Sequence, residues 1–391
     1  MPDVYQLREA RDKKIEEKKD RRKMMIIILV IVLIAIAGLA VFSYFYNNRC
    51  FYHYDVKSSV ERKDTNNIGY LYHNKKLLKY SRSGISAIDN KGKAVWNGGF
   101  EMKQPQLDTS GKYVSVADIG GKNLYVYSGE DEGVSVETTL PIVRAKVSGN
   151  GVVAALVEDS DSNILNIYNP YNKKEKLAVE IPTNVSDEGY PLDFDISPDG
   201  KSVVTSQMMV KGNTVETKVS FYNFTEVGQD QNTLVGGKSF GEKVISAIEF
   251  LGEDTVCVFY EDGFSIFKNM KKPELVNEVT YKETIKSISF DEEYLVVVTQ
   301  QNDETQTMHL CQLNGKEISS SPLGFSYANM KIYKNEIFFW SSKECHIVRS
   351  NGKEKFSSEF EDVIDGFFPT DTNNSYTIID REKINVIALK R

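Results

Sequence analysis

The chain has 391 residues, of which 41% are apolar and 26% are charged, and this composition excludes wholesale disorder. The net charge is −7, but residues 1–23 carry +3, which leaves −10 on the rest and argues against sequence-independent nucleic-acid binding. Four cysteines are too few for a disulfide scaffold, and 21 Tyr and 20 Phe favour β-strands.

Residues 1–23 predict a basic cytoplasmic tail, either simply solvated or a docking site for a cytoplasmic partner. Residues 24–46 carry no charge and, at ~1.5 Å per helical residue, are long enough to cross the ~30 Å hydrocarbon core. Because a cleavable signal peptide has a shorter apolar core of roughly 7–15 residues, we expect an uncleaved signal-anchor. The basic cluster at residues 21–23 predicts a cytoplasmic N-terminus, so residues 51–391 form an extracytoplasmic domain of a single-pass cell-membrane protein.

The clearest local pattern in residues 51–391 is the stretch Asp193–Gln207, DFDISPDGKSVVTSQ. An alternating segment ends at Ile196, a Ser-Pro-Asp-Gly turn follows, and a β-branched run begins at Ser202. Proline presets φ for such a turn, Asp can accept a bond from its own backbone, and Gly200 takes the φ > 0 position. The stretch therefore predicts a tight β-hairpin.

Looser copies of this hairpin recur along the chain, each followed by a third strand and usually by a weaker fourth. The eight units begin at Ile68, Gln106, Arg144, Asp193, Ala247, Ser287, Asn329 and Gly366. Four short antiparallel strands every ~40 residues are the period of a propeller blade. The second strand of each unit is the most apolar, which suits a strand covered on both faces by neighbouring blades.

The last unit reaches Arg391 after only three strands, whereas the segment Phe51–Val60 has no partner of its own. We expect this segment to complete the last blade and so remove the open edge of the ring. The predicted fold is all-β, an eight-bladed β-propeller preceded by one transmembrane helix. Seven blades remain the alternative if the first unit or the long unit near residue 193 is miscounted.

The SPDGK turn at Ser197–Lys201, followed by a β-branched strand, resembles the repeats of TolB-like and WD-repeat-like propellers. The whole layout resembles membrane-anchored propeller proteins of unknown function from Gram-positive bacteria of the Clostridia type. This resemblance implies a binding or scaffold platform and supplies no catalytic residue.

The strongest metal-site pattern is the D-x-D-x-N spacing of Asp159, Asp161 and Asn163, which begins a calcium loop with oxygen ligands. Its sixth position is Ile164 instead of Gly and its twelfth is Pro170 instead of Glu, so the weaker interpretation is a calcium site and the favoured one is a solvated hairpin tip that needs no metal. We predict no cofactor and no further metal site.

Asp193 and Asp195 lie on one face of a strand, where paired carboxylates could perform acid/base chemistry or bond the backbone of a neighbouring turn. The four histidines are far apart in the chain and form no zinc motif. No nucleophile, phosphate-binding or dinucleotide motif is present.

These patterns predict a protein that is not an enzyme: a binding or scaffold module for an envelope protein, a peptide or a glycan. Two alternatives stay open. An extracytoplasmic lyase or hydrolase on cell-wall or carbohydrate material requires carboxylates, His or Tyr converging at one mouth of the ring. A ligand sensor requires a partner that binds the short tail.

Overall fold

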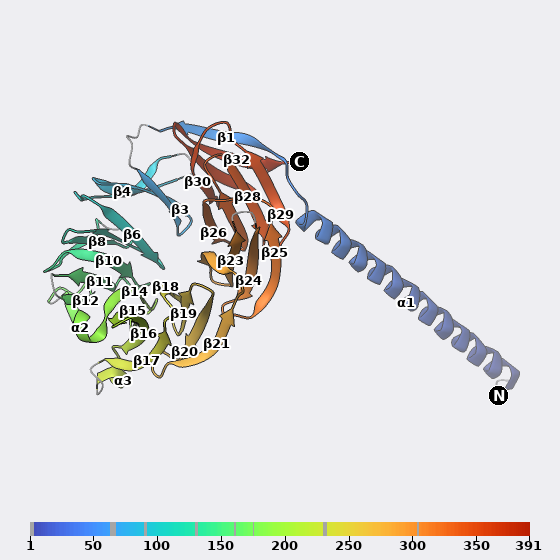
Figure 1. The fold of residues 1–391 in the computed structure, drawn as a ribbon. Coiled ribbons are helices and arrows are strands. Elements are labelled where there is room, and N and C mark those ends of the chain that lie inside the picture. The colour runs from blue at the N-terminus through green and yellow to red at the C-terminus, as the bar shows by residue number, and fades with distance from the viewer. Residues whose placement is uncertain are drawn as a thin grey trace. The chain divides into compact units, whose positions relative to one another are not determined.

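The computed structural model describes residues 4–62, 68–89, 92–129, 132–159, 162–174, 176–229, 233–302 and 305–391. The chain divides into two compact units, Met1–Phe51 and Tyr52–Arg391. The first unit contains the helix α1, and the second is a ring of β-sheets (Figure 1).

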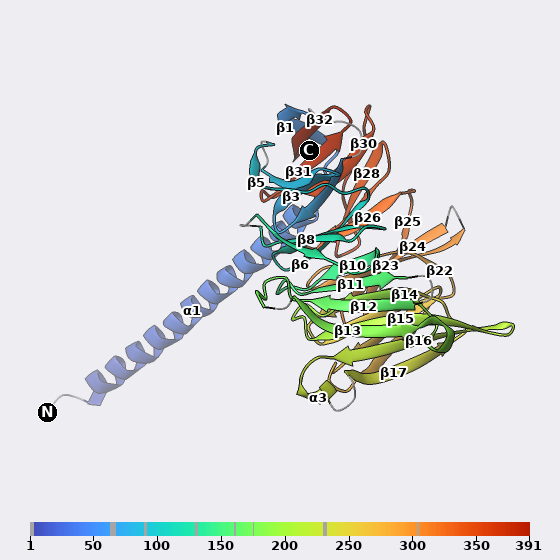
Figure 2. The ribbon, with the colours of Figure 1, turned by 90° about the vertical axis from the view of Figure 1, so that its left-hand side faces the viewer.

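Helix α1 (Val4–Asn47) is one continuous helix of 44 residues (Figure 2). Its segment Lys18–Asn47 contains an 18-residue window with a mean hydropathy of 3.4, and none of that window is buried by protein. By length and composition this segment could cross a membrane, as the uncharged run at residues 24–46 predicts.

The second unit is an eight-bladed propeller in which every blade is a four-stranded antiparallel sheet. Blade 1 contains β2 (Gly69–His73), β3 (Lys76–Ser81), β4 (Gly84–Ile88) and β5 (Ala94–Gly99). Blade 2 contains β6 (Pro105–Ser110), β7 (Tyr113–Asp118), β8 (Asn123–Tyr127) and β9 (Val134–Glu137). Blade 3 contains β10 (Ile142–Val147), β11 (Val153–Glu158), β12 (Ser162–Tyr168) and β13 (Leu177–Asn184). Blade 4 contains β14 (Tyr190–Ile196), β15 (Ser202–Lys211), β16 (Thr214–Asn223) and β17 (Leu234–Gly241).

The remaining four blades follow the same order. Blade 5 contains β18 (Ile245–Gly252), β19 (Thr255–Tyr260), β20 (Gly263–Lys268) and β21 (Glu274–Thr280). Blade 6 contains β22 (Thr284–Phe290), β23 (Tyr294–Asn302), β24 (Thr305–Gln312) and β25 (Glu317–Leu323). Blade 7 contains β26 (Asn329–Tyr333), β27 (Glu336–Trp340), β28 (Glu344–Arg349) and β29 (Glu354–Glu359). Blade 8 contains β30 (Ile364–Pro369), β31 (Ser375–Asp380), β32 (Lys383–Lys390) and β1 (His53–Glu61).

The eight-blade prediction is confirmed, and so is the predicted closure. Strand β1 pairs antiparallel with β32 from His53 opposite Lys390 to Glu61 opposite Lys383. The first segment of the propeller unit therefore forms the outer strand of its last blade, and the ring has no unpaired seam.

The apolar second strands lie between neighbouring blades, as the sequence predicts. Every residue of β31 is buried, and β7, β19 and β23 are buried over most of their length. The cores form between blades: Val114 and Val116 of blade 2 pack with Leu78 and Ile85 of blade 1. Burial at each such interface is the main force that holds the ring together.

The turn between β14 and β15 has the predicted chemistry. Gly200 has φ +69° and its N–H donates to the carbonyl of Ser197 (2.8 Å). The carboxylate of Asp199 accepts bonds from the Ser197 hydroxyl (2.7 Å) and from the N–H of Lys201 (3.1 Å). The turn thus fixes the end of the inner strand β14.

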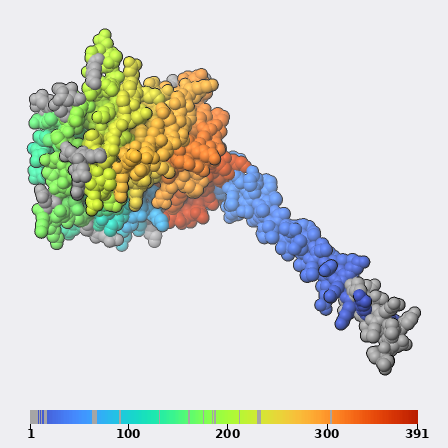
Figure 3. Space-filling model, turned by 90° about the horizontal axis from the view of Figure 1, so that it is seen from below, coloured from blue at the N-terminus to red at the C-terminus, as the bar shows by residue number. Residues whose placement is uncertain are grey.

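Two faces of the ring follow from this connectivity. The mouth face, as we call it, carries the turns that join the first strand of each blade to its second; the opposite face carries the turns that join the second strand to the third. On the opposite face the hairpin of β15 and β16 is the longest of its kind, with ten residues in each strand, and it projects beyond its blade (Figures 2 and 3). Two one-turn helices, α2 (Val185–Glu188) and α3 (Glu226–Gln229), flank this blade.

A β-bulge recurs near the start of the inner strands, where the register shifts by one residue. It lies before Arg144, Asp193, Ala247, Ser287 and Gly366. A bulge re-aims the side chains that follow it. In this ring it sets which residues of each inner strand face the central channel.

Candidate functional site

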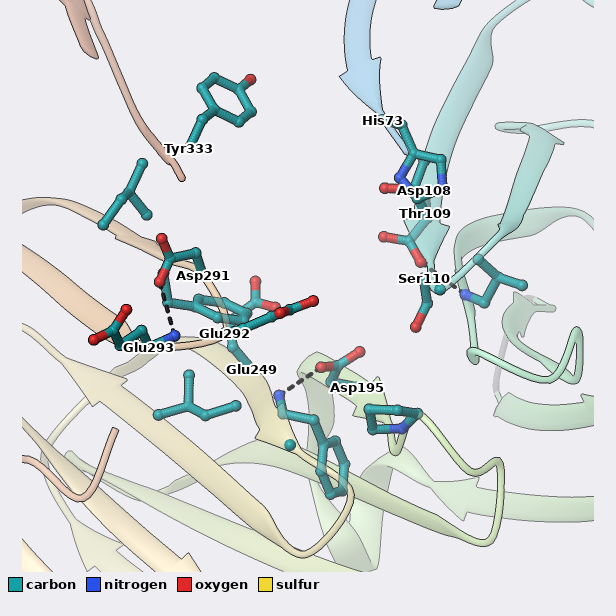
Figure 4. A pocket seen from close by; sticks show the side chains of 18 of the residues that line it. His73, Asp108, Thr109, Ser110, Asp195, Glu249, Asp291, Glu292, Glu293 and Tyr333 are labelled. Atoms are coloured by element: carbon teal, nitrogen blue, oxygen red, sulfur yellow. Dashed lines mark hydrogen bonds between the residues drawn. The ribbon is translucent and has the colours of Figure 1, made fainter. Parts of the chain in front are cut away.

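A cavity with a volume of about 770 Å³ forms the mouth of the central channel. Its walls are the carboxyl-terminal ends of the inner strands of blades 1 to 7 and the turns that follow them on the mouth face. Because the inner strands are fixed by the blades on either side, the walls belong to the rigid part of the fold. Figure 4 shows Asp108 beside His73 on one side and the acidic turn of Asp291, Glu292 and Glu293 on the other.

Several polar side chains of the inner strands bind the main chain of the next blade. The N–H of Val147 donates to Asp108 (2.7 Å), and those of Ile248 and Phe250 donate to Asp193 (2.8 Å) and Asp195 (2.7 Å). The hydroxyl of Ser289 accepts the N–H of Ile332 in the same way (3.0 Å). These bonds join blades 2 and 3, 4 and 5, and 6 and 7.

Asp193 and Asp195 therefore have a structural role, as one of the two interpretations of the sequence expects. Their partner is the inner strand of the next blade and not a neighbouring turn. Asp193 also forms an ion pair with Arg144 of blade 3. The two carboxylates do not form an isolated pair, because each is bonded to a different N–H of β18.

Lys146 is the central cation of the channel. Its ammonium lies 3.8 Å from Asp108 of blade 2 and 3.7 Å from Glu249 of blade 5. Burial alone would lower the pKa of Lys146, but Asp195, Asp108, Glu249 and Asp193 outweigh it and raise the pKa. Lys146 consequently stays protonated and links three blades across the channel.

The carboxylates around Lys146 are poorly solvated. Burial raises the pKa of Asp108, of Asp195 and of Glu249, and Lys146 offsets this only in part. Asp195 and Glu249 are further raised by neighbouring carboxylates. The floor of the cavity is a region where negative charge is incompletely compensated.

Lys331 of β26 is the second cation of the channel, and among the described residues it has no ion-pair partner within 4 Å. It is surrounded by protein on most sides, yet its side chain remains accessible from the channel. Burial lowers its pKa, whereas Glu249 and Asp108 act in the opposite direction.

One wall of the cavity is aromatic. The rings of Tyr72 and Tyr333 meet edge to face with centroids 5.4 Å apart. Burial lowers the pKa of the neighbouring His73 to about 4, so this histidine is neutral at physiological pH. The hydroxyl of Tyr72 and Nε2 of His73 are both buried, and neither has a hydrogen-bond partner in the part of the chain that the structure describes.

The adjoining wall is the turn between β22 and β23. The carboxylate of Asp291 accepts the N–H groups of Glu293 and Tyr294 (both 2.9 Å), and Glu293 accepts the side-chain amide of Asn335 (2.8 Å). Glu292, between them, is exposed, and it forms neither a hydrogen bond nor an ion pair with the residues that the structure describes. The turn holds Glu292 at the mouth with a free carboxylate.

The calcium pattern near residue 160 is not part of this site. Asp159 is exposed, whereas the side chain of Asn163 is buried in β12 and its Oδ1 has no hydrogen-bond partner. Asp161 lies outside the described residues. Within the part of the chain that the structure describes, no group of three or more His, Cys, Asp or Glu side chains is arranged to hold a metal ion.

The histidines are as dispersed in space as in sequence. His309 bonds Glu317 (2.8 Å), and His346 bonds Glu344 and Glu354 (2.8 and 2.9 Å) while stacking on Phe325. Cys257, Cys311 and Cys345 are buried free thiols, and burial raises the pKa of each. None of these thiols has the character of a nucleophile.

Sequence reasoning missed the charges that define the channel. Each stands in the first strand of its blade. Lys146, Glu249 and Lys331 have an apolar residue on both sides, and Asp108 follows Leu107 and precedes Thr109. Had the units been superimposed, the recurrence of a charge at this place in the first strand would have indicated a shared inward direction.

Comparison with known proteins supports the fold. BamB from Moraxella catarrhalis is 11% identical with a TM-score of 0.53, covering 86% of this chain and 100% of that chain. A eukaryotic initiation factor is 13% identical with a TM-score of 0.56, covering 86% of this chain and 89% of that one. At such low identity these likenesses show the fold alone, and the TolB-like and Clostridia-type resemblances stay predictions.

A comparison with curated protein sequences finds no significant match. Residues 47–389, which include the whole propeller apart from its last strand residues, match a protein family described as "Family of unknown function (DUF5711)". Because the match spans most of the chain, the protein belongs to this family.

Proposed function

We propose that the protein is a membrane-anchored binding module whose propeller lies outside the cytoplasm and captures an envelope protein, a peptide or a glycan at the mouth cavity. In this proposal α1 is the uncleaved anchor and the propeller is not an enzyme. A propeller is a general scaffold or binding fold, so the function must come from a site on it.

The observation that carries the proposal is the open cavity of about 770 Å³ at the mouth. Its volume is within the usual range of ligand sites, roughly 300–1,000 Å³. Its polar groups are positioned by inner strands that are bonded to one another through Asp108, Asp195 and Ser289. A preorganised wall lowers the cost of ordering the site on binding.

Blocking the mouth tests this role directly. Lys75 is an exposed lining residue, so Lys75→Cys can carry a bulky maleimide adduct there, in a Cys50→Ser background. The control is Lys282→Cys in the turn between β21 and β22, on the opposite face. We expect the adduct at Lys75→Cys, and not the one at Lys282→Cys, to abolish affinity capture of envelope components by the full chain. Equal capture by both labelled proteins would refute the mouth as the binding site.

The orientation is testable on intact cells. The reporter cysteine is placed at the exposed Glu132 and not at the nearby Gly129, because the φ of +85° at Gly129 disfavours any side chain. A membrane-impermeant maleimide should label Glu132→Cys in intact cells when Cys50 is replaced by Ser. Labelling that requires lysis would place the propeller in the cytoplasm and contradict the proposal.

One observation favours the alternative of a lyase or hydrolase. Carboxylates, His73, Tyr72 and Tyr333 converge at one mouth of the ring, as that alternative requires. Perturbed carboxyl pKa values in a cleft are also typical of active sites. Against it, Asp108 and Asp195 are bonded to main-chain N–H groups and Glu249 is paired with Lys146. Turnover of cell-wall fragments by the wild type that is lost in Glu249→Gln would establish the enzyme.

A further inference from the structure

The mouth cavity has a definite preference for charge and shape, which identifies a class of ligand. This step rests on the proposed function, since it takes the mouth as the binding site. Six carboxylates line the cavity, those of Asp108, Asp195, Glu249, Asp291, Glu292 and Glu293, against three lysines, Lys75, Lys146 and Lys334. Lys331 in the channel adds a fourth cation, which acts on Asp108 and Glu249 and leaves an excess of negative charge.

The lysines do not neutralise this excess. Lys146 is shared between Asp108 and Glu249, and Lys334 turns to the carbonyl of Thr370 (3.2 Å) and to Asp371 (3.9 Å) outside the cavity. His73 is neutral at physiological pH because of its burial. Only Lys75 among the lining lysines is an exposed cation without a described partner.

Hydrogen bonds fix the acidic turn of Asp291, Glu292 and Glu293 in a conformation that can bind a cation. Asp291 and Glu293 are committed to N–H groups of their own turn and to Asn335 of blade 7, so they fix its conformation. Glu292 keeps its carboxylate free at the rim. A cation that reaches Glu292 gains an ion pair without breaking an existing one.

The rest of the lining suits an alkyl stem. Phe250, Leu251 and Phe290 lie beside Glu249 and Asp291, and the Tyr72–Tyr333 pair forms the aromatic wall. Apolar surface accommodates the methylene groups of a long basic side chain, and aromatic faces attract its charged end. Small metal ions gain nothing from such walls, and the described residues form no metal-ligand group.

We infer that the mouth binds a basic side chain, Lys or Arg, presented by an exposed peptide segment of a partner protein. The ammonium or guanidinium lies against Glu292 and the acidic floor, and the stem packs on Phe250, Phe290 and the two tyrosines. An acidic or neutral glycan lacks both features.

The test uses fluorescent hexapeptides in which Leu flanks two Arg residues, two citrulline residues or two Glu residues. Citrulline keeps the shape of arginine and removes its charge. Binding to the full chain in detergent micelles is followed by fluorescence anisotropy. We expect the Arg peptide to bind at least tenfold tighter than the citrulline peptide, the Glu peptide not to bind, and added salt to weaken the complex.

Two matched variants locate the contact. Glu292→Gln at the mouth should weaken binding of the Arg peptide several-fold. Glu242→Gln, which replaces an exposed glutamate in a turn on the opposite face, should leave its binding unchanged. Both changes are on the surface, so neither should unfold the ring.

The inference is overturned if the Arg and citrulline peptides bind equally, if neither binds, or if Glu292→Gln and Glu242→Gln behave alike. These outcomes leave the proposed function intact when the Lys75→Cys adduct still blocks capture, because a glycan or an uncharged peptide would then be the ligand. If the proposed function itself is wrong, the full chain captures envelope components equally well with and without the Lys75→Cys adduct.

Discussion

The junctions between blades are built in two different ways. Blades 2 and 3, 4 and 5, and 6 and 7 are joined near the channel by side chains that accept main-chain N–H groups of the next inner strand. Blades 8 and 1 meet through an apolar cluster, in which Leu77 and Ile88 pack on Phe368 and Ile379. Arg62 adds to this junction, because it donates to Asp365 of blade 8 (2.7 Å) while its guanidinium lies over the ring of Tyr70 of blade 1.

The difference shows that polar and apolar side chains join different pairs of blades. At the polar junctions, Asp108 and Asp195 both hold the next blade and line the mouth cavity, so stability and site chemistry share the same atoms. At the closing junction, the pairing of β1 with β32 supplies the connection, and the inner strands contribute aromatic and apolar side chains. Four variants test this division, in order of expected effect.

Ile387→Ala probes the closing blade. Ile387 is fully buried in β32 and lies opposite Val56 of β1 and Tyr376 of β31. Removing its side chain leaves a cavity, and we expect the free energy of unfolding in urea to fall by about 4 kcal/mol. Val56→Ala, at a site 54% exposed, should change it by less than about 0.5 kcal/mol. Equal losses would mean that closure does not depend on packing within blade 8.

Lys146→Met probes the polar junctions. It leaves the carboxylates of Asp108, Asp195 and Glu249 without their central cation, and we expect a loss of about 3 kcal/mol at pH 8. The matched control is Lys316→Met, which replaces an exposed lysine.

The loss in Lys146→Met should depend on pH. A carboxyl whose pKa is raised by folding stabilises the protein fully below its unfolded pKa and loses that contribution as the pH rises through the folded pKa. Burial raises the pKa of Asp108, Asp195 and Glu249, so acidification from pH 8 to 5 should protonate them first in the variant and narrow its deficit. A deficit that is the same at both pH values would contradict a carboxylate origin.

Arg62→Ala removes the arginine of the closing junction. Arg62 also donates to the main-chain carbonyl of Asp380, and its guanidinium lies 5.2 Å from the ring centroid of Tyr70. We expect a loss of about 2 kcal/mol, since hydrogen bonds to charged groups are stronger than neutral ones. Arg82→Ala, which truncates an exposed arginine, serves as the control in thermal denaturation. An equal loss of stability in both variants would show that Arg62 does not contribute to the closing junction.

Ser289→Ala removes a single neutral bond, the one that Ile332 N–H donates between blades 6 and 7. We expect a loss of about 1 kcal/mol by urea unfolding, and no change for the exposed Ser320→Ala. A loss as large as that of Lys146→Met would show that the bond to the next inner strand, and not charge, dominates the polar junctions.

The fold could be predicted because its information is local. Each hairpin carries its own turn residues, as at Ser197–Lys201, and the missing fourth strand after Gly366 indicated how the ring closes. Blade number followed from counting such units, and the bounds of β14 and β15 agree with the turn between them.

The site could not be predicted in the same way, because its residues meet only after closure. Asp108 and Lys146 belong to different blades, and Glu249 approaches Lys146 from a third one across the channel. The bulges before Arg144 and Asp193 also change which side chains point into the channel. No residue type in the sequence predicts a bulge of this kind. The exposed acidic turn at Asp291–Glu293 was a visible signal, but Asn335, which binds it, comes from blade 7.

The pairing of β1 with β32 has a consequence for biosynthesis. During translation β1 is completed at Glu61, but its partner begins only at Lys383. At about 5–20 residues per second, the ribosome needs roughly 15–65 s to make the intervening chain. Throughout that interval β1 has no partner strand, so its main-chain N–H and C=O groups can pair with other chains. The sequence of β1, HYDVKSSVE, is mostly polar, and its residues are exposed or half-buried. This polarity limits such mispairing until the ribosome releases the last blade.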